Sequence, residues 1–479
     1  MNKPDALTLV IFGASGDLTR RKLMPALYLL YKAGRLPRRF AVLGMARTSY
    51  DDDRFRTSIR EGLLSFVRPD EVDEKAIQAF LSCLHYLSAD PSEPEAYAEL
   101  RTRLEEIDRT IDNPHNYLYY LATPPLLYGV IPRHLKAEGL NREGDGFRRI
   151  VVEKPFGYDL SSALELNRIY LDAFREEQIY RIDHFLGKET VQNILALRFA
   201  NSVFEPLWNR NYIDYVEITA VENMGIGTRG GFYDGVGTLR DMVQNHLAQL
   251  LAVTAMEPPA AFDASGFRNE VVKVYQSLTP LTGEDIRHSV VRGQYMASEG
   301  RKGYREEEQV PALSRTETYL AMRLELNNWR WGGVPFYIRT GKQMPTKVSE
   351  IVIHFKPAPY SLFRCEGGTC PVPNRLVIRI QPNEGIVLRL GMKKPGEGFE
   401  VLPMDMDFSY AELGRLPTED AYARLIEDCI AGDPTLFIRS DAVESGWRFF
   451  RSDTEILAGC AGMPALRLSG RLVGAVGGR

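Results

Sequence analysis

Apolar and polar positions near the N-terminus follow a pattern that predicts a strand, a turn, a helix and a second strand. The apolar run at 7–12 leads into the glycine-rich sequence GASG at 13–16. Apolar residues then recur at helical spacing as far as Gly34, and a second apolar run follows at 40–45. This order is typical of the start of a doubly wound, Rossmann-like α/β domain.

Later apolar runs divide the chain into two parts. Those at 117–122 and 149–152 predict further strands of the first domain, with helical patterns between them. Beyond about residue 180, several runs predict a largely antiparallel sheet with helices alongside: 215–221, 350–355, 375–380 and 385–390. We therefore predict an α/β Rossmann-like N-terminal domain at 1–180. A C-terminal β+α domain with a large, mainly antiparallel sheet follows at 181–479.

Charge and composition narrow the class of protein. The 479 residues include 59 Lys and Arg against 63 Asp and Glu, a formal net charge of −4. No overall basic field favours nucleic acid, although a local cationic cluster could still bind a sugar phosphate. The five cysteines show no disulfide-framework spacing, and no apolar run approaches a membrane span or a signal peptide. We expect a soluble, cytoplasmic protein without nucleic-acid or membrane partners.

The glycine turn is a candidate phosphate site, because glycines let the backbone approach a pyrophosphate and a helix N-terminus offers free N–H groups. GASGDL departs from GxGxxG, since Ser15 and Leu18 fill two of its positions. A plain tight turn is the alternative. Arg47 follows the second strand, where NAD enzymes usually place an acid against the ribose. Arginine suits a 2′-phosphate, which favours NADP over NAD, and an ordinary surface charge is the alternative.

Three later segments are richer in polar residues than core packing requires. They are EKPFG at 153–157, RIDHFLGK at 181–188 and RDMVQNH at 240–246. Oxidation of an alcohol needs a base for the hydroxyl proton, and a neutral histidine can serve at cellular pH. A carboxylate on the other ring nitrogen would fix its tautomer. On chemistry alone either His184 or His246 could be this base, and a hydrogen-bonded structural histidine is the alternative.

The chain resembles the glucose-6-phosphate dehydrogenase family in motifs that extend over residues 13–347, and WRFF near Trp447 is also similar. These motifs are GASGDLTRRK, EKPFG, RIDHFLGKE, RGGFYDGVGTLRDMVQNHLAQLL and VPFYIRTGKQMPTK. The combination of RIDHxLGKE with RDMVQNHL is highly specific. The resemblance implies a Rossmann domain joined to a β+α domain whose large sheet builds dimers or tetramers. It also implies NADP-linked oxidation of glucose 6-phosphate at C1, in the pentose phosphate pathway, with NAD as a weaker cofactor.

The resemblance also implies residue roles, with His246 as general base and Asp183 as the carboxylate that orients it. Residues expected to bind the substrate are Lys154, His184, Lys188, Glu222, Asp241, Lys342 and Lys347. Together with the GASGDL turn, the expected NADP site comprises Gly13, Ser15, Gly16, Asp17, Leu18, Lys22, Arg47 and Lys154. No metal is expected.

Two features depart from the family pattern. The family usually has tyrosine where this chain has Phe185, and loss of its hydrogen bond to the phosphate would cost about 1.5–3 kcal/mol, mainly raising KM. The tail after about residue 467, LSGRLVGAVGG, differs from the family's YPAGSWGP-like end. A one-base frameshift could produce it from such a sequence, and a divergent disordered tail is the alternative.

Two other functions compete with this interpretation. A related Rossmann-plus-sheet oxidoreductase could act on an unphosphorylated sugar, but it would not need several cationic side chains directed at one anion. A non-catalytic NADP sensor would be expected to lose the base or its partner. This chain keeps both Asp183 and His246, which favours an enzyme.

Overall fold

The computed structural model describes residues 3–281, 283–298, 300–360, 362–365, 373–396, 398–413 and 420–450. Residue contacts divide the chain into two compact units. The first unit contains Met1–Lys188, Ala260–Arg268 and Thr418–Glu444. The second contains Glu189–Pro259, Asn269–Pro417 and the residues from 445 onward. The altered tail lies outside the described residues.

A six-stranded, wholly parallel sheet forms the centre of the first unit, in the order β3-β2-β1-β4-β5-β6. Its strands are β1 (Ala6–Phe12), β2 (Arg39–Ala46), β3 (Leu84–Ser88), β4 (Tyr117–Leu121), β5 (Arg148–Val152) and β6 (Ile179–Arg181). Every residue of β1 and β4 is buried, as expected for a parallel sheet covered on both faces. This order is that of a Rossmann fold and confirms the predicted fold class.

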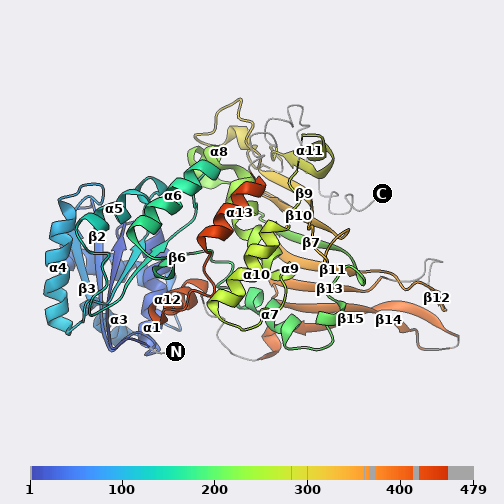
Figure 1. Cartoon of the computed structure of the whole chain (residues 1–479), viewed down its shortest axis with the longest axis horizontal. Helices are drawn as coiled ribbons and strands as arrows, with labels where there is room; N and C mark the ends of the chain where they lie inside the picture. The colour runs from blue at the N-terminus through green and yellow to red at the C-terminus, as the bar shows by residue number, and fades with distance from the viewer. Residues whose placement is uncertain are drawn as a thin grey trace. The chain divides into compact units, whose positions relative to one another are not determined.

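Helices flank this sheet, as Figure 1 shows. They are η1 (Thr19–Leu23), α1 (Met24–Lys32), α2 (Asp52–Phe66), α3 (Glu74–Ser82), α4 (Ala96–Ile111), α5 (Val130–Ala137), α6 (Leu160–Ala173) and α12 (Ala421–Ala431). Several begin at an aspartate side chain that caps free N–H groups. Asp51 accepts from the Arg54 N–H at 2.8 Å, and Asp159 accepts from the Ser162 N–H at 2.7 Å.

A nine-stranded sheet dominates the described part of the second unit, in the order β12-β15-β14-β13-β11-β7-β10-β9-β8. Its strands are β7 (Ile213–Val221), β8 (Val290–Gly293), β9 (Tyr319–Glu325), β10 (Pro335–Gly341), β11 (Val348–Phe355), β12 (Arg364–Cys365), β13 (Arg375–Gln381), β14 (Gly385–Lys393) and β15 (Glu400–Ser409). Two neighbouring pairs are parallel, β7 with β10 and β12 with β15, and the others are antiparallel. The predicted large, mainly antiparallel sheet is therefore confirmed.

Several helices accompany this sheet, and His246 lies on one of them. They are α7 (Glu189–Phe199), α8 (Gly230–Thr238), η6 (Leu239–Leu247), α9 (Ala248–Ala255) and α11 (Gly283–Ser289), and α10 (Ala264–Gln276) and α13 (Ser440–Phe450) include residues of both units. The polar segment at 240–246 lies in the π-helix η6, and the chain continues from it directly into α9. All eight residues of α9 are buried, so this helix is covered on every side and not on one face alone.

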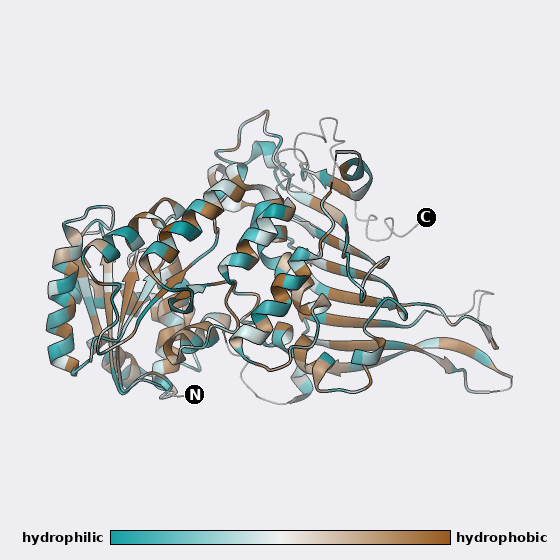
Figure 2. Cartoon of the chain, in the orientation of Figure 1, coloured by the Kyte–Doolittle hydropathy of each residue, from teal (hydrophilic) through white to brown (hydrophobic). Residues whose placement is uncertain are grey.

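Apolar residues concentrate in the two sheets. In Figure 2 the strands are largely brown, whereas outer helices alternate between brown and teal. Among the described residues, no helix combines the length and the apolar character needed to cross a membrane.

Candidate functional site

The glycine turn after β1 has a geometry that only glycine tolerates at its first position. Gly13 has φ +83°, and a Cβ there would lie 2.3 Å from the Ala122 carbonyl oxygen. The Gly13 N–H donates to the Met45 carbonyl at 2.8 Å, and the Gly16 N–H donates back to the Gly13 carbonyl at 2.9 Å. The helix starts at Asp17, so the first N–H groups of this helix lack intrahelical acceptors. This cradle fits a dinucleotide pyrophosphate.

Three further predicted cofactor residues have side chains that solvent can reach. Ser15 is exposed and its hydroxyl accepts from Thr48 Oγ1 at 2.8 Å. Arg47 is also exposed, directly after β2, and its charge helps to lower the pKa of Asp90 after the stronger effect of hydrogen bonds from Ser92. Lys22 is half-exposed and lies 3.9 Å from Asp420 Oδ2. Both cationic side chains are therefore accessible to an anionic ligand.

Strand β5 ends at a buried acid that the sequence analysis did not select. Glu153 is buried, and Tyr120 Oη donates to its Oε1 at 2.5 Å. Burial raises the pKa of the Glu153 carboxyl to about 7, against the opposing effects of the Tyr120 hydrogen bond and the Lys154 charge. Lys154, half-buried, precedes Pro155 through a cis peptide bond. The EKP sequence thus places an amine beside an acid that titrates near neutral pH.

The RIDH segment forms a tight turn after β6. Asp183 is buried, and its Oδ1 accepts the Phe185 N–H at 2.9 Å. The turn leaves His184 and Lys188 half-buried, while the Phe185 ring is buried. The Lys188 ammonium lies 3.7 Å from the centre of the Phe185 ring, a cation–π contact. Phe185 lacks a hydroxyl group, but it still positions one of the predicted phosphate ligands.

Tyr422 is a second residue that the sequence analysis missed. It belongs to α12, and its ring lies parallel to the His184 ring, with 6.5 Å between centroids and 5° between planes. Burial raises the pKa of its hydroxyl above the ordinary value. No motif near Tyr422 indicated this contact, because more than two hundred residues separate it from His184.

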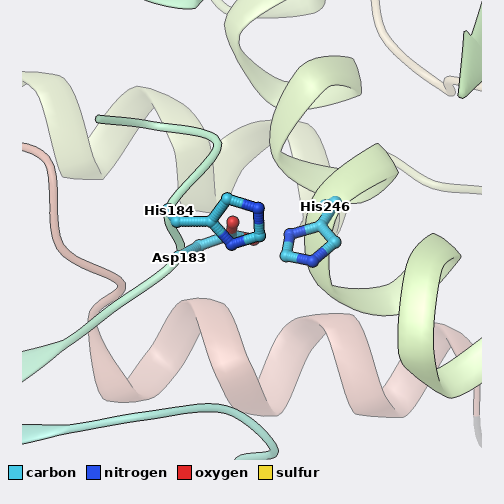
Figure 3. A group of neighbouring side chains, drawn as sticks. All are labelled: Asp183, His184 and His246. Carbon is cyan, nitrogen blue, oxygen red and sulfur yellow. The ribbon is translucent and has the colours of Figure 1, made fainter. Parts of the chain in front are cut away.

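His246 lies on η6, in the second unit, and is buried. Figure 3 draws Asp183 and His184 on the segment that follows β6, and His246 on its helix. Since Asp183 and His246 belong to different units, their joint action stays a prediction.

A charged cluster in the second unit joins three of the predicted substrate residues. The buried Lys342 ammonium forms an ion pair with Glu222 and lies 3.5 Å from Asp241 Oδ2. It also lies 5.8 Å from the centre of the Tyr233 ring. Strand pairing explains the cluster, because Lys342 follows β10 and Glu222 follows its parallel neighbour β7. Two carboxylates held by one lysine can accept hydrogen bonds from sugar hydroxyl groups.

Lys347 is placed differently from this cluster. It is exposed and lies immediately before β11, whereas the ammonium close to Glu222 and Asp241 is that of Lys342. An exposed amine keeps its rotamer freedom until a ligand orders it. Among the predicted site residues, the structure therefore groups Glu222 with Asp241 and Lys342, and separately the catalytic candidate Asp183 with His184 and Lys188.

Comparisons with known families cover almost the whole chain. Residues 10–193 match the family described as glucose-6-phosphate dehydrogenase, NAD binding domain, and residues 195–461 match its C-terminal domain. A glucose-6-phosphate 1-dehydrogenase from Aggregatibacter actinomycetemcomitans is 52% identical over 93% of this chain and 90% of its own length. One from Treponema pallidum is 48% identical over 92% and 87%.

Solved structures give the same result. A glucose-6-phosphate dehydrogenase in complex with its substrate glucose 6-phosphate matches with a TM-score of 0.89 and 34% identity, over 99% of this chain and 97% of that one. A glucose-6-phosphate 1-dehydrogenase from Mycobacterium avium matches with a TM-score of 0.80 and 36% identity, over 94% and 91%.

Proposed function

Because the chain belongs to the glucose-6-phosphate dehydrogenase family, we propose that it oxidises glucose 6-phosphate at C1 to 6-phosphoglucono-1,5-lactone, the first step of the pentose phosphate pathway. The observation that carries this proposal is similarity over both domains at about half identity. It favours a phosphorylated substrate over the free sugar of the rival oxidoreductase. It also favours an enzyme over a non-catalytic NADP sensor.

The proposed base is His246, which takes the C1 hydroxyl proton, with Asp183 on its other ring nitrogen. A carboxylate there fixes the tautomer and stabilises the imidazolium that forms. When bound, the nicotinamide supplies the hydride acceptor, and the protein supplies orientation. The burial of His246 and of Asp183 supports this pairing, since charge stabilisation is stronger away from water.

Cationic side chains would hold the substrate at its phosphate end, far from C1. His184 and Lys188 are the proposed phosphate ligands, Lys347 is a further substrate-binding lysine, and Lys154 meets both sugar and cofactor. Glu222 and Asp241, fixed by Lys342, would accept hydrogen bonds from the sugar hydroxyl groups. Binding energy gained at the phosphate can then position C1 for reaction.

We propose NADP as the preferred cofactor and NAD as a weaker one. The Gly13–Leu18 turn would hold the pyrophosphate, and Arg47 and Lys22 would meet the 2′-phosphate. Two observations support this choice. Gly13 has a positive φ, and the position after β2 carries the exposed Arg47 and not the carboxylate that is usual in NAD enzymes.

A second copy of this chain is the proposed partner, in a dimer or a pair of dimers. One face of the β14–β15 pair is apolar, and its register pairs are Ile386 with Phe408, Leu388 with Met406, Leu390 with Met404, and Met392 with Leu402. Met404 is 51% exposed and Met406 64% exposed. Exposed apolar patches of this kind are typical of protein interfaces.

We propose the cytoplasm as location, because the described free cysteines, Cys83 and Cys429, suit a reducing compartment.

Absorbance at 340 nm tests the proposed reaction directly. Purified protein is mixed with glucose 6-phosphate or glucose, and with NADP or NAD. We expect rapid reduction of NADP with glucose 6-phosphate, slower reduction of NAD, and no turnover of glucose. Turnover of free glucose at a comparable rate would instead support the rival oxidoreductase.

The proposed base is tested by the His246→Asn variant. We expect kcat to fall by about a hundredfold or more, with little change in the Kd for glucose 6-phosphate, because general-base catalysis contributes about 10²–10⁴-fold. The matched control is His288→Asn, at an exposed histidine of α11. A near-normal kcat in His246→Asn would place the base elsewhere.

A further inference from the structure

A cavity of about 390 Å³ lies in the second unit, next to the start of η6. Three arginines line it, each from a different segment: Arg240 on η6, Arg292 on β8 and Arg315 in the loop before β9. The remaining lining residues are Asp234, Val236, Gly237, Ser314, Thr316 and Glu317. None of these nine residues belongs to the substrate or cofactor residues proposed above.

The charges around the cavity favour an anion. Three guanidinium groups face two carboxylates, so the lining carries a surplus of one positive charge. Protein donors already engage both acids: Glu317 Oε1 accepts the Leu239 N–H at 3.0 Å, and Asp234 Oδ1 accepts the Tyr304 hydroxyl at 2.9 Å. Arg292 is 5% exposed. Burial raises the pKa of the Glu317 carboxyl, and the charges of Arg292 and Arg240 act against this rise.

The loop that carries Arg315 is fixed on both sides of that residue. Gln294 Nε2 donates to the carbonyls of Ser314 and Thr316, at 3.1 and 2.8 Å. Thr316 Oγ1 donates to the Asp234 carbonyl at 2.7 Å, and the Ser314 hydroxyl donates to the Asp234 carboxylate. The exposed Arg315 therefore extends from an anchored backbone, which lowers the entropy cost of holding a ligand.

From this geometry we infer that the cavity is a binding site for a small phosphorylated molecule, separate from the substrate and cofactor sites. Guanidinium groups bind phosphate oxygens in pairs, and three of them can surround one phosphate group. Ser314 and Thr316 line the cavity beside them, and their hydroxyl groups fix this part of the lining by donating to Asp234. The volume is near the lower end of ligand cavities, about 300–1,000 Å³, which suits a small metabolite and not a dinucleotide.

Calorimetric titration with inorganic pyrophosphate tests this site. Saturating glucose 6-phosphate and NADPH, a pair that cannot react, first occupy the proposed substrate and cofactor sites. We expect pyrophosphate still to bind the wild-type protein, and its Kd to rise about tenfold in Arg315→Gln, as loss of one charged hydrogen bond predicts. The matched control is Arg323→Gln, an exposed arginine of β9 that pairs with Glu325 outside the cavity. It should keep the wild-type Kd.

Three results would overturn the inference. They are the absence of pyrophosphate binding to the wild-type protein, an unchanged Kd in Arg315→Gln, and an equal loss in Arg323→Gln. Succinate serves as the comparison for a carboxylate ligand at the same ionic strength. Weaker binding of succinate than of pyrophosphate supports the phosphate assignment, and equal or tighter binding contradicts it.

Discussion

Glu153 illustrates how the fold changes the chemistry of a single side chain. Burial raises its pKa to about 7, from the ordinary value of 4.5 for a glutamate. The folded protein therefore binds a proton in a pH range where the unfolded chain has released it. The resulting stabilisation is full below about pH 4.5 and is lost as the pH rises through 7. The folded state must then hold a buried carboxylate, with Tyr120 as its hydrogen-bond donor.

Glu153→Gln should reduce this pH dependence. We expect the free energy of unfolding of the wild type to fall between pH 5 and 7 by about 1 kcal/mol per unit more than that of the variant. Urea titrations at several pH values measure the difference. Asp428, whose pKa burial also raises to about 7, contributes the same slope to both proteins. Glu99→Gln, at an exposed residue of α4, should behave like the wild type. Parallel curves for Glu153→Gln and the wild type would show that Glu153 remains ionised.

In the proposed function, Arg47 would favour NADP over NAD. Arg47→Ala should lower kcat/KM for NADP by about tenfold or more and leave the value for NAD within twofold, since only NADP carries the 2′-phosphate. Initial rates at 340 nm with each cofactor measure both values. Arg54→Ala removes an exposed arginine of α2 in the same unit and should change neither. Equal losses for NADP and NAD would contradict this role.

Local motifs were enough to propose some residues of the candidate site and could not indicate others. Asp183, His184 and Lys188 were predictable because they lie together in one short segment. Tyr422 was not, because its stacking on His184 depends on where α12 returns to the first unit. Glu153 was named only as part of EKP, and its high pKa depends on burial and on Tyr120, neither of which the motif contains.

The α8–η6 segment carries Asp241 and His246, and its start depends on one glycine. Gly237 interrupts the helical conformation with φ +73° and ψ 169°. A Cβ at this position would lie 2.6 Å from Glu317 Oε1, the atom that accepts the Leu239 N–H. The Glu317 carboxylate thus accepts a hydrogen bond from the first turn of η6, and only a glycine at position 237 leaves room for this carboxylate.

Gly237→Ala should therefore lower both stability and activity. We expect a loss of about 1–3 kcal/mol in the free energy of unfolding, from the strained φ and the displaced Glu317, together with a lower kcat. Gly235→Ala is a close control, because nothing lies within 4 Å of its added Cβ. Since Gly235 is helical, alanine there should be neutral or stabilising by about 0.5–1 kcal/mol. Similar unfolding curves for the two variants would contradict this explanation.

Sequence patterns predicted these elements unevenly, for a physical reason. The strands β1, β2, β7 and β13 follow directly from apolar runs, because a buried strand needs little else. A π-helix at 239–247 has the same apolar spacing as an α-helix over so short a stretch, so the pattern could not distinguish them. Residues 260–268 and 418–444 belong to the first unit through long-range contacts that no local pattern encodes.

At the scale of the whole molecule, the second sheet continues beyond the helices that cover it. Helix α7 contacts β13, where Leu376 and Ile378 are buried. Leu388 and Ile386 of β14 lie opposite these two residues in register and so face the same side, but they are only partly buried. On the opposite face of the β14–β15 pair, Arg389 forms an ion pair with Asp405, in which Nη2 donates to Oδ2 at 2.6 Å. The apolar face of β14 and β15 thus extends beyond helix α7, and it suits packing against the same sheet of a second copy of the chain.

A charge at the centre of this face should separate the copies. Met406→Asp places a carboxylate at a position that is 64% exposed in one chain, so the chain itself should fold normally. In a dimer the carboxylate would be buried without a partner, at a cost of several kcal/mol for each copy. Light scattering after gel filtration should therefore show the wild type at a multiple of 54.2 kDa and the variant at the single-chain mass. Met296→Asp, at another exposed methionine of the second unit, should keep the wild-type mass. A monomeric wild type, or an unchanged mass in Met406→Asp, would show that this face does not join the copies.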